Sequence, residues 1–326
     1  MQKKMLTGFR PTGKLHLGHL HGNIKNMIEN QSKYENFFFL VDWHALSTEY
    51  QDPKNIKNNL IDCVIDLIAL GVDPGRTHLY RQSDIAAIPE LTLYFSMITP
   101  LSWLERCPTY KEQMRELGAK DLSTLGFFSY PVLMAADILI VNADIIPVGE
   151  DQLPHLEITR EIARRFNYLY GDYFTEPQEL LSKSTRVPGI DGRKMSKSYG
   201  NAIFLSDESG IIKEKVRQMI TDPERIRKTD PGHPEVCNVF SFYKIYKFGT
   251  IKEIENRCKE GEVGCIGCKD EIASIISDSL EDFRQKRAKL EKNKSLIHDI
   301  LESGSKKVSE IAKETINIVR TRMGID

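Results

Sequence analysis

A continuous apolar run at residues 37–41, Phe-Phe-Phe-Leu-Val, restricts the fold of this chain more than any other segment. A strand with one face in water alternates apolar and polar residues, whereas an unbroken apolar run suits a parallel strand covered on both faces. Two further apolar segments, at residues 4–9 and 77–81, have helical patterns between them at about residues 18–33 and 53–70. This strand–helix alternation predicts a doubly wound parallel α/β sheet with right-handed crossovers.

The length of 326 residues suits two domains. We expect a Rossmann-like nucleotide-binding domain over residues 1–200, with a mixed helical segment inserted at about residues 84–125. Strand signals thin out from about residue 205, so residues 201–326 are expected to form an all-α domain. We expect its last helix to pack back on the first domain.

The formal net charge is -1, so no global basic field points to nucleic acid, and we expect no DNA partner. The N-terminal residues lack the apolar stretch of a signal peptide, and no run of about 18 apolar residues exists. These features predict a cytoplasmic protein with no membrane contact. Its six cysteines are then reduced thiols or metal ligands rather than disulfides.

The first motif lies at residues 8–22, Gly-Phe-Arg-Pro-Thr-Gly-Lys-Leu-His-Leu-Gly-His-Leu-His-Gly. This pattern predicts a strand, a Pro/Gly turn and the start of a helix. The free backbone N–H groups at a helix start can bind phosphate. Gly18 lets a nucleotide ring approach the backbone, and the imidazoles of His16 and His19 can donate hydrogen bonds to phosphate oxygens. The alternative is a surface strand–turn–helix with incidental histidines.

The second motif lies at residues 192–201, Gly-Arg-Lys-Met-Ser-Lys-Ser-Tyr-Gly-Asn. Its glycines permit a mobile loop, and Lys194 and Lys197 are compact cations that meet phosphates as point charges. Taken alone, this segment also fits a solvated basic loop.

Together the motifs resemble a known family. Residues 16–19 resemble the His-Ile-Gly-His signature of class I aminoacyl-tRNA synthetases, and residues 194–198 match their Lys-Met-Ser-Lys-Ser signature letter for letter. Residues 130–139 and 148–152 resemble the tryptophanyl members in particular. Many tryptophanyl members carry Asn where this chain has His19, which restores the general class I pattern.

The resemblance implies that the chain activates L-tryptophan with ATP and Mg²⁺ and transfers it to tRNA(Trp), as a homodimer. The nucleophile of the first step is already a carboxylate, so positioning and phosphate-charge stabilisation are required rather than a general base. The resemblance assigns catalysis to His16, His19, Lys194 and Lys197. It assigns ATP binding to Arg10, Pro11, Thr12, Gly18, His19, Gly149, Glu150, Asp151, Gln152, Val187, Lys194, Met195, Ser196, Lys197 and Ser198.

Tryptophan offers one polar group on its ring, the indole N–H, which only donates. A buried carboxylate is the complementary acceptor, and Asp137 lies within an otherwise apolar helical segment. The alternative is a capping or paired structural aspartate. By resemblance, the tryptophan pocket comprises Asp137, Met134, Leu6, His44, Tyr130, Ile146 and Val148.

Four cysteines, Cys237, Cys258, Cys265 and Cys268, are separated by 20, 6 and 2 residues. Such density in a cytosolic protein indicates a metal centre, although zinc sites usually pair two Cys-x₂-Cys units and only one is present. The spacing resembles the [4Fe–4S] motif of an iron–sulfur-containing bacterial subset of tryptophanyl enzymes, in which the first interval is somewhat longer. We therefore expect an iron–sulfur cluster, with Zn²⁺ as the alternative.

Three rival functions share part of this pattern. A tyrosyl-tRNA synthetase shares both signatures, a small-molecule nucleotidyltransferase shares the first, and a catalytically silent synthetase-like RNA-binding regulator would have lost the chemistry. The intact His16, Gly18, His19, Lys194 and Lys197 argue against such a loss.

Overall fold

The structure, a computed structural model, describes residues 2–11, 13–108, 123–181, 187–197, 199–227 and 229–326. It forms two compact units, which are described separately. The first unit comprises Met1–Gly13, Asn26–Ser182 and Leu290–Asp326, and the second comprises Lys14–Lys25 and Lys183–Lys289. The division expected near residue 200 falls inside the second unit, because segments distant in sequence pack together in each unit.

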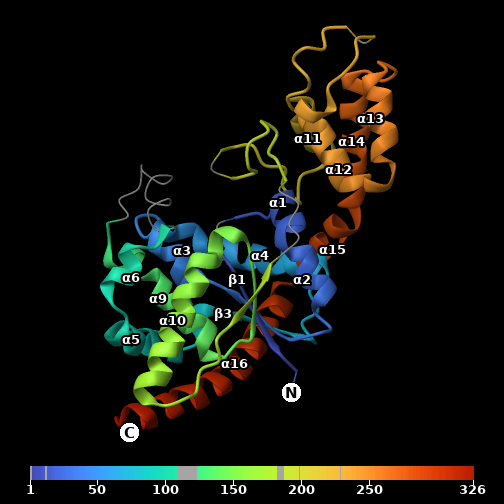
Figure 1. Cartoon of the computed structure of the whole chain (residues 1–326). Helices are drawn as coiled ribbons and strands as arrows, with labels where there is room; N and C mark the ends of the chain where they lie inside the picture. Colours follow the sequence, from blue (N-terminus) through green and yellow to red (C-terminus); the bar gives the residue numbers. More distant parts are fainter. Residues whose placement is uncertain (1, 12, 109–122, 182–186, 198, 228) are drawn as a thin grey trace. The chain divides into compact units, whose positions relative to one another are not determined.

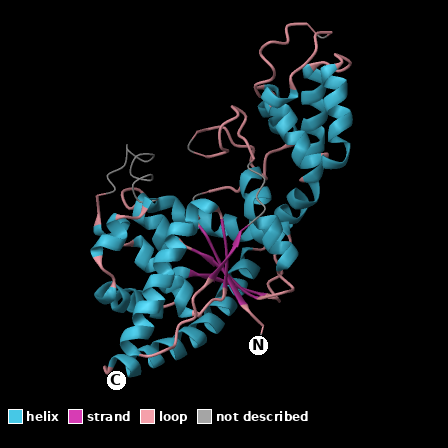
Figure 2. Cartoon of the chain, in the orientation of Figure 1, coloured by secondary structure: helices cyan, strands magenta, loops and turns pink. Residues whose placement is uncertain are grey.

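The first unit is built on a parallel sheet of five strands in the order β3-β2-β1-β4-β5, drawn in magenta in Figure 2. This confirms the predicted α/β class. The strands are β1 (Lys4–Phe9), β2 (Glu35–Leu40), β3 (Thr77–Arg81), β4 (Ile145–Val148) and β5 (Gln178–Leu181). The sequence did not predict β5, because this edge strand, Gln-Glu-Leu-Leu, is largely exposed and has no apolar run.

Helices follow the strands as the crossover connections of a doubly wound fold require (Figure 1). The apolar run at residues 37–41 forms most of β2 and the residue after it, and the next residues form helix α3. The helices of this unit are α2 (Lys25–Asn30), α3 (Asp42–Glu49), α4 (Ile56–Leu70), α5 (Ala87–Ile98), α6 (Leu101–Glu105), α8 (Leu125–Phe128), α9 (Tyr130–Ile140), α10 (Leu153–Tyr170) and α16 (Lys294–Met323).

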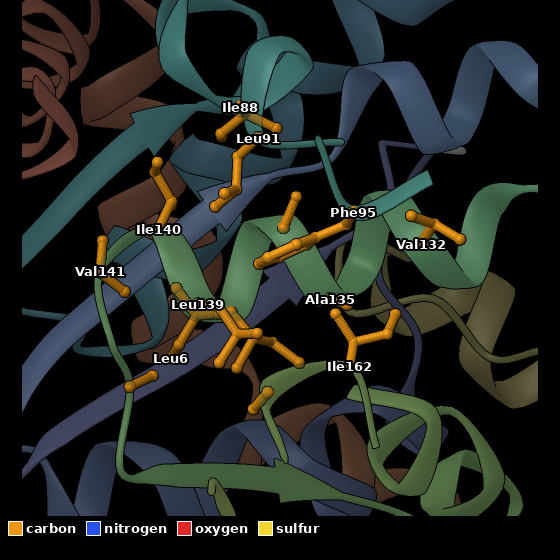
Figure 3. Close-up of a cluster of buried hydrophobic side chains, with 14 of the residues drawn as sticks. Leu6, Ile88, Leu91, Phe95, Val132, Ala135, Leu139, Ile140, Val141 and Ile162 are labelled. Atoms are coloured by element: carbon orange, nitrogen blue, oxygen red, sulfur yellow. The ribbon is translucent and has the colours of Figure 1, made fainter. Parts of the chain in front are cut away.

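Helix α9 lies in the middle of the apolar core. Its side chains pack with residues of β1, α5 and α10, including Leu6, Phe95 and Ile162 (Figure 3). A helix that is apolar on all sides has to be buried on all sides. The one acidic residue of α9, Asp137, is only 1% exposed and therefore needs internal partners.

Helix α16 packs against the edge strand β3 through Gly304. A Cβ atom on Gly304 would lie 1.9 Å from the carbonyl oxygen of Leu79, so only glycine allows this approach. Ser305 on the same helix donates a hydrogen bond to Asp84 at 2.8 Å, and Arg320 forms an ion pair with Glu90. The C-terminal helix thus covers one edge of the sheet.

The described part of the second unit is mostly helical. Its helices are α1 (Leu17–His19), a π-helical turn (Leu20–Ile24), α11 (Ser209–Arg217), α12 (Asn238–Tyr246), α13 (Ile251–Lys259), α14 (Cys265–Ser279) and most of α15 (Glu281–Glu291). Among the residues that the structure describes, no helix combines the length and apolarity needed to cross a bilayer.

Candidate active site

The first signature is held in the second unit by backbone pairing with residues distant in sequence. Leu17 N–H donates to the Ile203 carbonyl at 3.0 Å, and Leu205 N–H donates to the Leu15 carbonyl at 2.9 Å. His16 forms an antiparallel bridge with Phe204 between these two bonds. The start of α1 is therefore fixed by the segment that directly follows the second signature.

Gly18 is where the two signatures meet. A Cβ atom on Gly18 would lie 2.9 Å from the His16 ring and 3.5 Å from the Cβ atom of Met195. Any larger residue would displace the His16 ring, so Gly18 serves the packing of the signature itself in addition to the nucleotide approach expected from the sequence. The structure thus brings residues 16–19 and 195 together.

His16 and His19 are neutral hydrogen-bond donors rather than cations. Burial lowers the pKa of His16 to about 4, with a further contribution from the positive charge of Lys197. Burial also lowers the pKa of His19 well below its usual value, followed by the charges of His16 and Lys197. The His16 N–H donates to His19 Nδ1 at 3.1 Å, so the His19 proton is on Nε2.

The His16 ring retains bonding capacity for a ligand. Its Nδ1 atom is buried and has no hydrogen-bond partner among the described residues. A buried polar atom without a partner is costly, and a phosphate oxygen would satisfy it if the proton is on this nitrogen. The dependence of both histidine pKa values on Lys197 shows that this lysine of the second signature lies within electrostatic range of the first.

The second signature lies in a segment that we call the lysine loop, residues 187–201. Asn201, which is 2% exposed, organises it: its side-chain oxygen accepts from Ser196 N–H, and its amide donates to the Lys194 carbonyl and to Asp191. Val187 forms the base of the loop, where its carbonyl accepts from Met195 N–H at 3.3 Å. Thr12 and Ser198 lie outside the described residues.

In the first unit, Asp137 is the centre of a buried polar network. Gln82 Nε2 donates to both carboxylate oxygens, at 2.8 and 2.9 Å, and His44 Nε2 lies 2.8 Å from Oδ2. Burial raises the pKa of Asp137, and the contacts with His44 and Gln82 oppose that shift. A carboxylate has about four lone-pair sites. These three contacts leave room for one more donor.

A second chain of hydrogen bonds runs through Tyr130. Gln152 Oε1 lies 2.9 Å from His155 Nδ1, and His155 Nε2 contacts the Tyr130 hydroxyl. Because an amide oxygen only accepts, His155 carries its proton on Nδ1 and accepts from Tyr130. Burial lowers the pKa of His155 to about 4, so the ring is neutral. The Tyr130 oxygen keeps its lone pairs for another donor, such as an ammonium group.

The remaining predicted residues lie in or directly after β1 and β4. These neighbouring strands have crossovers in opposite directions, and doubly wound sheets bind ligands at the carboxyl ends of such strands. Leu6 and Ile146 are buried within the strands, Val148 is buried at the end of β4, and Gly149 follows it. The Arg10 guanidinium donates to the His44 carbonyl at 2.8 Å and to Thr48.

The other residues predicted at this end of the sheet are also located. Met134 lies on α9 one turn before Asp137 and is half-buried, and Pro11 is buried after β1. Gly149 allows Asp151 to approach, because a Cβ atom on Gly149 would lie 2.6 Å from Asp151 Oδ1. Glu150 begins a short turn that leads into α10, and the side chain of Gln152 donates to Asp151 at 3.0 Å.

A cavity of about 580 Å³ is lined by Tyr130 and by residues of α3. Its lining is mostly apolar and includes Trp43, Leu46 and Leu133, but neither His44 nor Asp137. The buried Asp137 network is therefore separate from this cavity.

The four cysteines expected to bind metal are all partly buried and reduced. Burial, together with the charges of Cys258, Cys265 and Cys237, raises the pKa of Cys268 to about 11, so the four sulfur atoms lie within electrostatic range of one another. Nevertheless, within the described ranges no three His, Cys, Asp or Glu side chains form a group that would hold a metal ion. The arrangement of side chains thus gives the predicted metal centre no support.

Sequence reasoning missed Gln82 and His155. Both are 1% exposed or less, and each fixes a residue that was predicted. Gln82 lies directly after β3, at the edge where the other site residues lie, and this position was the signal that would have singled it out. His155 lies three residues after Gln152 on a helical pattern, a spacing that places both side chains on one face.

Comparisons with known proteins agree with this geometry. The family model of class I tRNA synthetases (W and Y) matches residues 2–281, and the chain belongs to this family. The tryptophan–tRNA ligase of Thermotoga maritima is 44% identical, with 99% of each chain covered, and that of Aquifex aeolicus is 41% identical, with 99% of this chain and 100% of the relative covered.

Solved structures give the same result. The tryptophanyl-tRNA synthetase of Campylobacter jejuni, complexed with ADP and tryptophan, has a TM-score of 0.89 and 34% identity over 98% of this chain and 99% of that one. A tyrosyl-tRNA synthetase of Archaeoglobus fulgidus, complexed with L-tyrosine, has a TM-score of 0.67 and 22% identity over 87% and 90%, a likeness of fold alone.

The electrostatics of the first signature predict that His16 stays neutral down to about pH 5, because burial and Lys197 lower its pKa to about 4. The unfolded chain binds this proton near pH 6.5, so the free energy of unfolding falls as the pH drops from 6.5 towards 4. An NMR titration of the His16 ring measures the midpoint directly. The exposed His233, whose pKa is raised by Asp222, is the internal control. A His16 midpoint near 6.5 would contradict this account.

Proposed function

We propose that this chain activates L-tryptophan with ATP, forming tryptophanyl-adenylate and pyrophosphate, and then transfers the tryptophanyl group to the 3′ end of tRNA(Trp). The observation that carries this proposal is the meeting of the two signatures, with Gly18 against Met195 and Lys197 within electrostatic range of His16 and His19. The relatives that match over the full length are named tryptophan–tRNA ligases, which supports the same substrate.

In the first step, a carboxylate oxygen of tryptophan attacks the α-phosphorus of ATP, and pyrophosphate leaves with the electrons of the broken P–O bond. No proton has to be removed from the nucleophile, so the chain needs no general base. The neutral His16 and His19 donate hydrogen bonds to the phosphates, and Lys194 and Lys197 supply the positive charge that the departing pyrophosphate requires. Mg²⁺ enters with ATP.

Other residues of the ATP site hold the nucleotide. Arg10, Pro11 and Thr12 follow β1, and Gly149, Glu150, Asp151 and Gln152 follow β4, so these two groups belong to the crevice of a doubly wound sheet. Val187, Met195, Ser196 and Ser198 belong to the lysine loop. The proposed adenosine contact is at Gly18.

Asp137 selects the amino acid. Its one remaining lone-pair site accepts the indole N–H, while Gln82 and His44 hold the carboxylate in place. Leu6, Met134, Ile146 and Val148 supply the apolar walls, and the Tyr130 oxygen accepts from the substrate ammonium group. A site built around a ring N–H rejects phenylalanine strongly, because the acceptor would be buried without a partner. Tyrosine is the nearest competitor, since its hydroxyl group also donates.

We further propose that Cys237, Cys258, Cys265 and Cys268 hold a [4Fe–4S] cluster, with Zn²⁺ as the alternative. The donor type fits both, because thiolates bind iron–sulfur clusters and zinc. Arg225 Nη1 lies 3.9 Å from Cys258 Sγ. Such a donor stabilises negative charge on sulfur. The cluster would brace the loops of this unit.

The cellular context is also proposed from family membership. The chain works in the cytoplasm as a homodimer, binds tRNA(Trp), and has no DNA or membrane partner.

Pyrophosphate exchange into ATP tests the activity. Exchange should depend on tryptophan among the twenty amino acids, and Lys197→Ala should lower its rate at least ~10²-fold, because a preorganised charge contact to the leaving group is lost. Lys259→Ala is the matched control, since this exposed lysine of α13 pairs with Glu255 and should leave the rate unchanged. Exchange with tyrosine would contradict the specificity, and a rate near wild type in Lys197→Ala would contradict the role of the loop.

The metal proposal is tested on the anaerobically purified protein. It should be brown and contain iron and sulfide in the ratio of one cluster per chain, and Cys265→Ser should lose both. Cys63→Ala, which changes a buried cysteine of the first unit, should retain them. A colourless protein with one zinc would overturn the choice of iron, and a protein with neither metal would overturn the site.

A further inference from the structure

We infer that Asn238 and Tyr246, the first and last residues of α12, are positioning residues that hold the two signatures in register. The inference rests on the proposed role of the lysine loop. Asn238 contacts that loop, and Tyr246 contacts the helix that carries the first signature. All of these residues belong to the second unit.

At the N-terminal end of α12, the side-chain amide of Asn238 donates to two backbone carbonyl groups. Asn238 is 7% exposed, and its Nδ2 atom lies 2.7 Å from the Gly189 carbonyl and 3.2 Å from the Ile190 carbonyl. An amide NH₂ group has two hydrogens to donate, so one side chain satisfies both carbonyls. Removing it would leave the buried Gly189 carbonyl and the partly buried Ile190 carbonyl without this donor.

This contact fixes the whole lysine loop because the loop is internally bonded. Gly189 N–H donates to the Arg193 carbonyl at 2.7 Å, and Ile190 N–H donates to the Asn201 carbonyl at 3.0 Å. Pro188 forms an antiparallel bridge with Lys194. The segment that Asn238 contacts is therefore the one that pairs with the Lys194 segment, so a shift of Gly189 and Ile190 would shift Lys194 as well.

The contact at the other end of α12 reaches the first signature. The Tyr246 hydroxyl lies 3.1 Å from His21 Nε2, and the two rings pack edge to face with centroids 5.1 Å apart. His21 lies two residues after His19, in the π-helical turn Leu20–Ile24. Single π-helical turns are uncommon and occur frequently at functional sites. The nine-residue helix α12 thus contacts both the lysine loop and the helical turn that follows the first signature.

Phosphoryl transfer depends on placement, and a displacement of about 1 Å can cost about 10²-fold in rate. If α12 sets the spacing of the two signatures, its contacts affect the transition state of adenylate formation more than the binding of tryptophan. It follows that changes at its ends should alter kcat for adenylate formation and leave the KM for tryptophan nearly unchanged.

The test uses Asn238→Asp and Tyr246→Phe in the full chain. The first replaces the donating NH₂ group with an oxygen of the same size, and the second removes only the hydroxyl. Asn167→Asp is the matched control, because Asn167 also donates its amide to a backbone carbonyl, that of Phe174 at 2.8 Å, but in the first unit. We expect Asn238→Asp to lower kcat of exchange at least ~10-fold and Tyr246→Phe to lower it about 3-fold, by misplacement of the reacting groups.

A second readout does not depend on activity. Trypsin cleaves after Arg193, Lys194 and Lys197, so the initial rate of cleavage in the lysine loop without substrate reports how firmly it is held. Asn238→Asp should raise this rate about 10-fold over wild type and over Asn167→Asp, as expected when a buried bond of about 1.4 kcal/mol is lost.

The outcomes separate this inference from the proposed function. If Lys197→Ala abolishes exchange while Asn238→Asp leaves both kcat and cleavage unchanged, the inference is overturned and the proposed function stands. If Lys197→Ala leaves exchange unchanged, the role of the loop fails, and the cleavage rate alone then decides whether Asn238 holds it. If Asn238→Asp does not fold, Tyr246→Phe decides, and an unchanged kcat in that variant overturns the inference.

Discussion

The burial of one full charge, that of Asp137, imposes the strongest constraint on the first unit. An isolated carboxylate in an apolar core is unstable unless it is hydrogen-bonded, and every neighbour on α9 is apolar. Its partners come from the ends of two parallel strands: His44 from the helix after β2, and Gln82 from the turn after β3. The sheet order thus decides whether the charge can be buried, and the same order creates the crevice in which a ligand lies.

In the second unit, the neutral histidines and the charged lysines of the two signatures lie on separate segments. The histidine rings of the first signature lie with their centroids 3.7 Å apart, and burial keeps both neutral, an effect that Lys197 reinforces. The lysine charge that acts on both histidines is that of Lys197 in the lysine loop, whose own hydrogen bonds converge on Asn201. A site that keeps its cations on a separate loop can bind ATP with neutral donors and apply charge only when the loop engages the leaving group.

Much of this arrangement follows from sequence. The apolar run before Asp42 predicted a buried parallel strand, and the segments at residues 4–9 and 77–81 were confirmed as strands because their burial leaves a clear pattern. The polar edge strand β5 has no such pattern in its sequence. The π-helical turn after His19 was also missed, because hydrophobic spacing cannot distinguish it from an α-helix. Asn238 was missed as well, because it acts through tertiary contacts that no local pattern records.

The most direct test of the central claim, that Asp137 recognises the indole N–H, is to compare binding of tryptophan with that of its benzothienyl analogue, in which sulfur replaces the ring N–H. A hydrogen bond to a charged acceptor predicts that the wild-type chain binds tryptophan about 10- to 100-fold more tightly, and that Asp137→Ala abolishes this preference. Equal affinities of the wild-type chain for the two ligands would contradict the account.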